Sequence, residues 1–156
     1  MVVSRRERIE LDAAHDRLQA AVLASLRQLG FELTPVELGR TVSVDGRAFT
    51  PIPAVHTVPA IGYHLDSGAA SLVFTGDTGP NDALWRVVNR IGNLKYLIIE
   101  TAFSNKERHL ADISRHLCPL TLADELKKLE LNAEIYITHM KPGEIEPTML
   151  EIEECA

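Results

Sequence analysis

The sequence predicts an α/β protein in which a mixed sheet is flanked by helices, and three observations lead to this expectation. Residues 1–30 have the three-and-four spacing of apolar side chains that is typical of an amphipathic helix. Residues 31–75 alternate with period two and are interrupted by turn residues, as short strands and hairpins are. After Pro80, helical patterns alternate with buried-strand patterns, which favours βαβ units.

The N-terminal segment is expected to be a helix from about Ser4 to Leu29. Its apolar stripe runs through Leu18 and Val22, charged residues fill the other face, and the next residue, a glycine, is a natural C-terminal stop. His15 lies in this stripe. We therefore expect His15 to be a structural residue.

The period-two region predicts short strands joined by tight turns. Asp45-Gly46 is a strong signal for a two-residue hairpin, and residues 66–70 form a second turn. His64 alternates with apolar neighbours and is expected to face solvent. The expected strands are Phe31–Leu33, Val36–Leu38, Thr41–Val44, Phe49–Val55, Ile61–Leu65 and Ser71–Thr75.

Helices and strands are expected to alternate over the last half of the chain. Asn81 or Asp82 can cap a first helix that ends near Gly92, and Pro119 suits the first position of a second helix. Strands are expected at 96–99 and 134–138, the second helix to Leu129, and a last helix or tail around residues 149–152. The chain has no internal repeat or linker, which predicts one domain over 1–156, with a helix at 1–30 and the sheet and its helices at 31–156.

Composition and charge narrow the class of protein. The chain has 156 residues, of which 46% are hydrophobic and 24% charged, as in a globular protein. A net charge of −6 argues against a general nucleic-acid surface. Cys118 and Cys155 form no C-x-x-C pair and are expected to be free thiols. No apolar run of membrane-spanning length and no signal-peptide pattern is seen, so we expect a soluble, cytoplasmic protein without a membrane partner.

Three predicted strands end on residues that can bind a metal ion. His56 follows one apolar run, Asp77 follows Leu-Val-Phe-Thr-Gly, and His139 follows Ile-Tyr-Ile-Thr. Imidazole and carboxylate both suit zinc and neighbouring metals. Each residue alone is compatible with a plain turn or a packed histidine. Their shared position, each followed within four residues by a proline, predicts a metal site at the strand tips.

Five motifs in order carry a resemblance to a known superfamily. They are His-Thr-Val-Pro-Ala-Ile-Gly-Tyr (56–63), Phe-Thr-Gly-Asp-Thr-Gly-Pro (74–80), Ile-Glu-Thr-Ala-Phe (99–103), Ser-Arg-His-Leu-Cys-Pro (114–119) and Thr-His-Met-Lys-Pro (138–142). Over residues 31–154 the chain resembles the C-terminal half of a metallo-β-lactamase-fold hydrolase. Within that superfamily it is most similar to the class II cyclic-nucleotide phosphodiesterases, with ribonuclease Z enzymes as further relatives. The resemblance implies half of an αββα sandwich.

The resemblance also implies roles for individual residues. His56 resembles a ligand of one metal, Asp77 the aspartate that bridges two metals, and His139 a ligand of the second metal. His116 resembles the histidine near the scissile phosphate, with general acid catalysis as the natural hypothesis and a helix-edge histidine as the alternative. Among the remaining candidates, His109 is expected to be solvated, and Glu100 to be a supporting or capping carboxylate.

The sequence departs from the superfamily at its main metal motif. It contains no His-x-His-x-Asp-His string, so His56 with Asp77 and Asp77 with His139 would give each zinc ion two ligands. Catalytic zinc sites usually take three protein ligands, and we expect weak or partial metal binding. The N-terminal half of the sandwich is also expected to be missing. A fragment, a mis-assigned start, or a half-domain that needs a partner chain would each account for this. Without that half the chain would expose a large apolar surface, so a homo-oligomer is also possible.

Three functions follow as expectations. The resemblance implies a metal-dependent phosphodiester hydrolase of the 3′,5′-cyclic-nucleotide phosphodiesterase type, and the acidic charge fits a small nucleotide better than a polynucleotide. A ribonuclease Z-like or other hydrolase of the same fold is the alternative, although no basic arm for tRNA is visible and nucleic acid is an unlikely partner. The third possibility is a chain that is inactive alone.

Overall fold

The computed structural model describes residues 17, 20–31 and 35–155, which belong to two compact units, residues 1–36 and 37–156. In the first unit a helix runs over residues 20–28 and ends in a turn at Gly30, whose φ of +84° suits glycine. The Phe31 N–H donates to the Leu26 carbonyl at 3.1 Å and closes this end. The first part of the predicted helix, with His15, lies outside the described residues.

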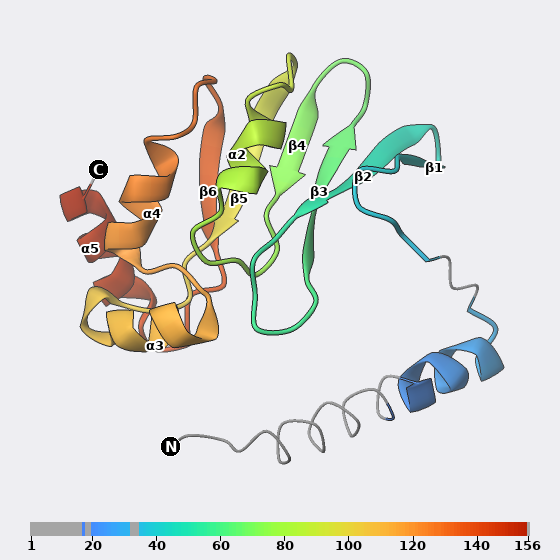
Figure 1. The fold of residues 1–156 in the computed structure, drawn as a ribbon. Helices are drawn as coiled ribbons and strands as arrows, with labels where there is room; N and C mark the ends of the chain where they lie inside the picture. Colours follow the sequence, from blue (N-terminus) through green and yellow to red (C-terminus); the bar gives the residue numbers. More distant parts are fainter. Residues whose placement is uncertain (1–16, 18–19, 32–34, 156) are drawn as a thin grey trace. The chain divides into compact units, whose positions relative to one another are not determined.

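Six strands of the second unit form one mixed sheet whose order follows the chain, β1 to β6 (Figure 1). Strands β1 to β4 pair antiparallel, whereas β4–β5 and β5–β6 pair parallel. Asp45 and Gly46, with φ of 50° and 76°, form the predicted hairpin turn. The predicted α/β class is confirmed. The strands are β1 Val42–Val44, β2 Arg47–Pro53, β3 Ile61–Asp66, β4 Ser71–Phe74, β5 Leu94–Glu100 and β6 Glu134–Thr138.

The helices of this unit lie between and after the parallel strands. They are α2 Asp82–Val88, the 3₁₀ helix η1 Asn105–Glu107, α3 Arg108–Ser114, α4 Pro119–Leu126 and α5 Ile145–Cys155. Asn81 is the N-cap of α2, and its side-chain oxygen accepts hydrogen bonds from two backbone N–H groups of the first turn. Among these helices, none is long and apolar enough to cross a membrane.

Several of the sequence-based boundaries were wrong. Residues 36–38 form no strand, because Val36 and Glu37 have no regular structure and Leu38 lies in a turn. Phe31 is also irregular, and residues 32–34 lie outside the described part of the chain. The second helix ends at Leu126, three residues earlier than expected. Helices η1 and α3 were not expected.

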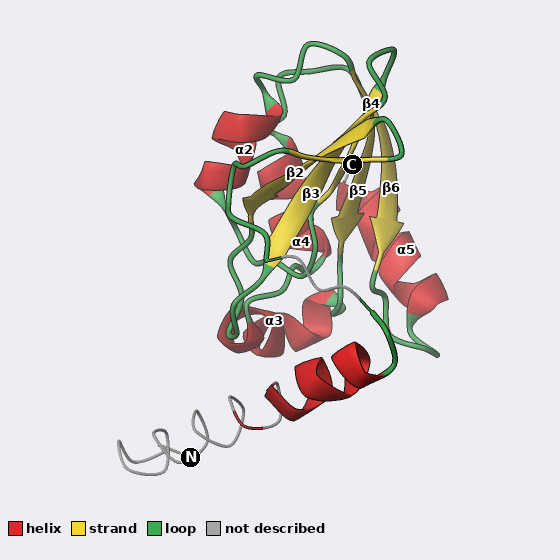
Figure 2. Ribbon diagram, turned by 90° about the vertical axis from the view of Figure 1, so that its right-hand side faces the viewer, coloured by secondary structure: helices red, strands yellow, loops and turns green. Residues whose placement is uncertain are grey.

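Helices α2 and α4 cover one face of the sheet and form the core with it (Figure 2). The alternation along each strand directs one set of apolar side chains to this face. Val73 and Leu97, which are neighbours in the parallel β4–β5 ladder, are both fully buried. The main contributors are Ile52, Val73, Leu84, Trp85, Val88, Leu97, Ile99, Leu117 and Leu122.

The opposite face of the sheet carries a row of large apolar and aromatic side chains. Strand pairing places Tyr63, Phe74, Ile98 and Tyr136 next to one another across β3 to β6. Phe74 is 39% exposed and Tyr136 is 51% exposed. We call these four residues the aromatic row.

His64 does not face solvent, so that expectation was wrong. It pairs with the fully buried Val73 and therefore lies on the helix-covered face. Its Nε2 is the one buried side-chain polar atom of the described residues that has no hydrogen-bond partner. Burial lowers the pKa of His64, because the charged imidazolium is disfavoured away from water.

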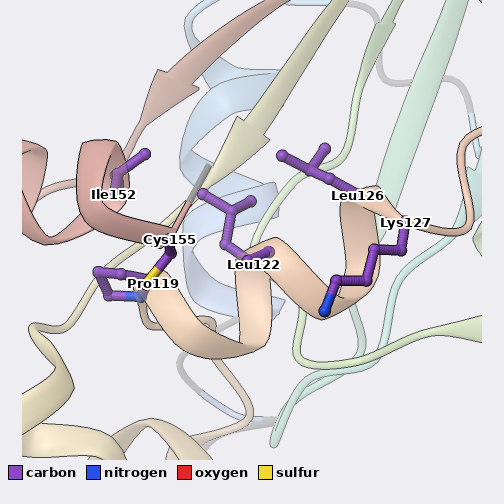
Figure 3. Close-up of a pocket in the computed structure, with 7 residues that line it drawn as sticks. Pro119, Leu122, Leu126, Lys127, Ile152 and Cys155 are labelled. Atoms are coloured by element: carbon purple, nitrogen blue, oxygen red, sulfur yellow. The ribbon is translucent and has the colours of Figure 1, made fainter.

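Helices α4 and α5 pack side by side and leave a small apolar pocket of about 290 Å³ between them (Figure 3). Leu122 and Ile152 line it from the two helices, and Lys127 and Cys155 also border it. None of the predicted site residues belongs to this pocket. Cys118 and Cys155 are free thiols, as predicted.

Candidate functional site

Strand direction brings the predicted site residues to one edge of the sheet. Strands β2, β4, β5 and β6 all run the same way, because β3 is antiparallel to both β2 and β4. Their C-terminal ends therefore meet at one edge, which is where open α/β sheets bind ligands. His56, Asp77 and His139 follow β2, β4 and β6, and Glu100 is the last residue of β5. His116 comes from the loop between α3 and α4.

Two glycines let the loop of Asp77 approach strand β3. A Cβ on Gly76 would lie 2.6 Å from the Ile61 carbonyl oxygen, and Gly76 has φ of +64°. A Cβ on Gly62 would lie 2.6 Å from the carbonyl oxygens of both Phe74 and Thr75. These distances are too short for any side chain, so only glycine fits at both positions. The close backbone contact between β3 and the loop after β4 thus positions the Asp77 backbone.

The structure brings His56, Asp77, His116 and His139 together in one cluster, which we call the histidine–aspartate cluster. The carboxylate of Asp77 lies between two histidines, with Oδ1 3.2 Å from His139 Nδ1 and Oδ2 3.8 Å from His56 Nε2. The ring of His116 stacks on His139 at a centroid distance of 5.2 Å and meets His56 edge-on at 4.7 Å. His109, by contrast, is exposed, as expected.

The buried carboxylate of Glu100 is hydrogen-bonded to the ring of His116. This carboxylate is 1% exposed, and Oε1 lies 2.7 Å from His116 Nδ1. Oε1 also accepts the Thr78 N–H at 3.0 Å, while Oε2 accepts the N–H groups of Ala102 and Leu117 at 3.0 and 3.4 Å. Glu100 thus ties the loops of Asp77 and His116 to the end of β5. It is a supporting carboxylate, as the sequence suggested, and its partner could not be read from the sequence.

Burial sets the protonation of the cluster. It raises the pKa of Glu100 to about 7, although the N–H groups of Thr78 and Leu117 act in the opposite direction. Burial also lowers the pKa of His56, and the neighbouring His116 lowers it further, whereas Asp77 raises it. Burial lowers the pKa of His116 as well, against the opposing effect of Asp77. The lowered pKa values favour neutral His56, the form that binds metals, and make protonated His116 a stronger acid.

The donor set fits a divalent metal. Each of His56, Asp77 and His116 offers a ligand atom, and these three atoms all lie within 4.8 Å of one another. His139 adds a fourth nitrogen beside Asp77. The Thr57 backbone N–H donates to His56 Nδ1 at 2.6 Å, and Thr57 Oγ1 lies 2.9 Å from the same atom. In the neutral ring this hydrogen bond puts the proton on Nε2, which faces Asp77, so metal binding through Nε2 requires the other tautomer. Mixed imidazole and carboxylate donors suit zinc, iron, manganese and related ions.

Comparison with known protein families identifies the fold. The family model described as a beta-lactamase superfamily domain matches residues 6–151. This chain belongs to that family. The metallo-β-lactamase-fold superfamily expected from the five motifs is thus confirmed. The family implies divalent metals, and the histidine–aspartate cluster is a possible site for one.

Solved structures of the superfamily share the fold at low sequence identity. The metallo-β-lactamase-fold protein YhfI from Bacillus subtilis is 17% identical with a TM-score of 0.68, over 86% of this chain and 56% of YhfI. Yeast PDE1 is 17% identical with a TM-score of 0.59, over 79% of this chain and 42% of PDE1. Human tRNase Z, short form, is 17% identical with a TM-score of 0.52, over 64% of this chain and 38% of the enzyme. The chain spans about half the length of YhfI and less than half the length of the other two proteins. Among curated proteins, none matches the chain.

Proposed function

We propose that this beta-lactamase-superfamily chain carries part of the active site of a metal-dependent phosphodiester hydrolase that acts on 3′,5′-cyclic nucleotides. One observation carries the proposal: a carboxylate shared by two histidines lies beside a third histidine that is oriented by a buried glutamate. The first part suits metal binding, and the second suits proton transfer to a leaving group.

Three residues would hold the metals. His56 and Asp77 would bind one ion, and Asp77 and His139 the other, so that Asp77 serves both. Divalent ions bound in this way activate water and stabilise the charge on phosphoryl oxygens. Because these residues give two ligands to each ion, metal binding to this chain should be no tighter than micromolar.

His116 would act as the general acid. As an imidazolium it donates Nδ1–H to Glu100 and keeps Nε2–H for the leaving ribose oxygen. Burial lowers the pKa of His116, which makes its imidazolium a stronger acid. Glu100 is a positioning residue in this scheme, since it fixes the ring and its tautomer without touching substrate.

Calorimetric titration with zinc and with manganese tests the metal site. We expect weak binding to the purified chain and about a hundredfold loss or more in the Asp77→Ala variant, because one carboxylate serves both ions. Lys127→Ala, a change of an exposed residue directly after α4, is the control. Equal affinity in the Asp77→Ala variant would refute the site.

Turnover of 3′,5′-cyclic AMP and GMP tests the reaction. We propose that a chain supplying a His-x-His-x-Asp-His motif completes the ligand set, so we expect no turnover by this chain alone and turnover after such a half-domain is added. His116→Ala should then slow hydrolysis by about 10² to 10⁴. A preference for a precursor tRNA over cyclic nucleotides would favour a ribonuclease Z-like enzyme.

A further inference from the structure

Two cationic side chains border the histidine–aspartate cluster from different loops. Lys141, in the loop after β6, places Nζ 3.8 Å from the ring centroid of Phe103, and that ring lies 5.7 Å from the ring of His116. Arg115, in the loop before α4, donates from Nη1 to the carbonyl oxygen of His56 at 3.2 Å. Neither residue has a place in the metal or acid roles described above.

The position of these cations is electrostatically unfavourable for the cluster itself. Lys141 reaches the cluster across the Phe103 ring beside His116, and Arg115 lies against the backbone carbonyl of His56, so both positive charges lie close to cluster histidines. The family implies divalent metals, and an ion held by the cluster would add more positive charge. A bound anion would offset this accumulation of positive charge.

The contacts that these two side chains already make do not account for their position. Lys141 meets the Glu107 carboxylate at 3.3 and 3.4 Å, but the two side chains are 40% and 35% exposed, and such ion pairs contribute little to stability. A lysine ammonium on its flexible stem can exchange such a partner for a ligand.

The backbone of Arg115 has an unusual conformation and lies close to Gly79. It has φ of +58°, an uncommon value outside glycine, and a Cβ on Gly79 would lie 3.3 Å from the Arg115 backbone. Its guanidinium uses one N–H on His56 among the described contacts, and a guanidinium has five. Its remaining donors are available for a bidentate contact with phosphate.

We propose that Arg115 and Lys141 form an anion-binding rim that grips the phosphoryl group of the substrate, so that the site selects phosphate esters over neutral esters and lactams. The identity of the substrate in this inference rests on the proposed function. Anion binding by Arg115 and Lys141 does not depend on it and can be measured on this chain alone. Phe103 supports Lys141 and keeps its ammonium on the side of His116.

Binding of inorganic phosphate to the metal-free protein tests the rim directly. We expect Arg115→Met and Lys141→Met each to weaken phosphate binding about tenfold, the loss of one charge-assisted hydrogen bond, and the double variant to abolish it. Lys127→Met, which removes an exposed lysine paired with Asp124, is the control and should bind as the parent does. Thermal unfolding of each variant checks that it is folded.

Glu107→Gln separates an anion-binding lysine from a structural one. Removing the Glu107 carboxylate frees Lys141, so phosphate should bind several-fold more tightly to this variant. A merely structural ion pair would give unchanged phosphate binding. The rim is refuted if the parent does not bind phosphate, or if the parent and the double variant bind it equally.

Steady-state kinetics of the completed enzyme distinguishes failure of the rim from failure of the proposed function. Raised KM for cyclic nucleotide in Lys141→Met, with metal affinity unchanged, supports both. Unchanged KM in both single variants would refute the anion-binding rim, while the proposed hydrolase function would remain supported. If no hydrolysis is found but phosphate binding still depends on Arg115 and Lys141, the rim stands and the reaction is wrong.

Discussion

At the scale of single residues, Glu100 decides the geometry of the candidate site. It is buried at the end of β5, is hydrogen-bonded to His116, and accepts hydrogen bonds from the backbone N–H groups of three other residues. A charged carboxylate in such a place is tolerated only because every oxygen is hydrogen-bonded. The sequence showed an acidic residue after a buried strand but not its partner, because His116 lies 16 positions away on another loop.

Glu100→Gln should destabilise the fold by about 1–3 kcal/mol. In the parent both carboxylate oxygens accept backbone N–H groups, whereas in the variant one of these oxygens is replaced by an NH₂ group, which cannot accept them. The loss should be larger at pH 5 than at pH 8. The pKa of Glu100 is raised to about 7 in the folded chain from an ordinary value of 4.5, so the folded state binds the proton more tightly. Its contribution to stability is therefore present at low pH and declines as the pH rises from 4.5 through 7.

Urea denaturation at the two pH values measures this difference. Glu130→Gln, at an exposed position, is the control and should leave stability unchanged. A deficit that is independent of pH, or larger at pH 8, would contradict the assignment.

His64→Leu should stabilise the chain by about 1 kcal/mol, because it removes a buried nitrogen without a partner. The gain should increase as the pH falls below 6.5. The folded pKa of His64 is lowered by burial, so the unfolded chain binds the proton more tightly and the parent loses stability on acidification. Denaturant unfolding at pH 8 and pH 5 checks this, and a variant less stable than its parent at both would show that the imidazole has a partner in solution.

At the scale of elements, the strands were predictable and one helical segment was not. Period-two patterns located β2 to β4, and the buried-strand patterns after Pro80 located β5 and β6, all within a few residues of their observed bounds. Helix α3 gave no such signal, because its apolar residues Leu110 and Ile113 are 42% and 60% exposed. It also ends at Arg115 in the left-handed conformation, where a glycine would have marked the stop.

Gly76→Ala tests whether the backbone contact between the Asp77 loop and β3 positions the metal ligands. The new Cβ would meet the Ile61 carbonyl oxygen at 2.6 Å in a conformation that disfavours alanine, so the loop must shift. We expect metal affinity to fall about 10- to 100-fold. Gly92→Ala, where a Cβ meets nothing within 4 Å, is the control in the same calorimetric titration. Equal loss in both variants would assign the effect to glycine removal in general.

At the scale of the whole molecule, helices cover one face of the sheet and the aromatic row lies on the other. Sequence periodicity could predict that both faces carry apolar residues, but not which face the helices would cover. That depends on which way the connections after β4 and β5 turn. His64 was misplaced for the same reason, since its alternation alone does not distinguish the two faces.

Phe74→Asp should reduce self-association of the purified chain. A large, half-exposed aromatic surface favours contact between copies, and a carboxylate in the middle of the row opposes it. Sedimentation velocity at several concentrations should show the parent in larger species and the variant as monomer. Leu120→Asp, on α4 at 44% exposure, is the control and should behave as the parent. Identical sedimentation of the parent and Phe74→Asp would exclude the aromatic row as the contact.

Glu100 Oε2 accepts hydrogen bonds from the N–H groups of both Ala102 and Leu117. These bonds join the two ends of the chain segment between these residues. The Ala102 N–H also donates to the Leu117 carbonyl at 3.2 Å, so the intervening stretch leaves and returns at nearly one point. Residues 104–113, with η1 and most of α3, therefore form a closed excursion whose exposed positions can vary in sequence while its two ends stay joined at Glu100.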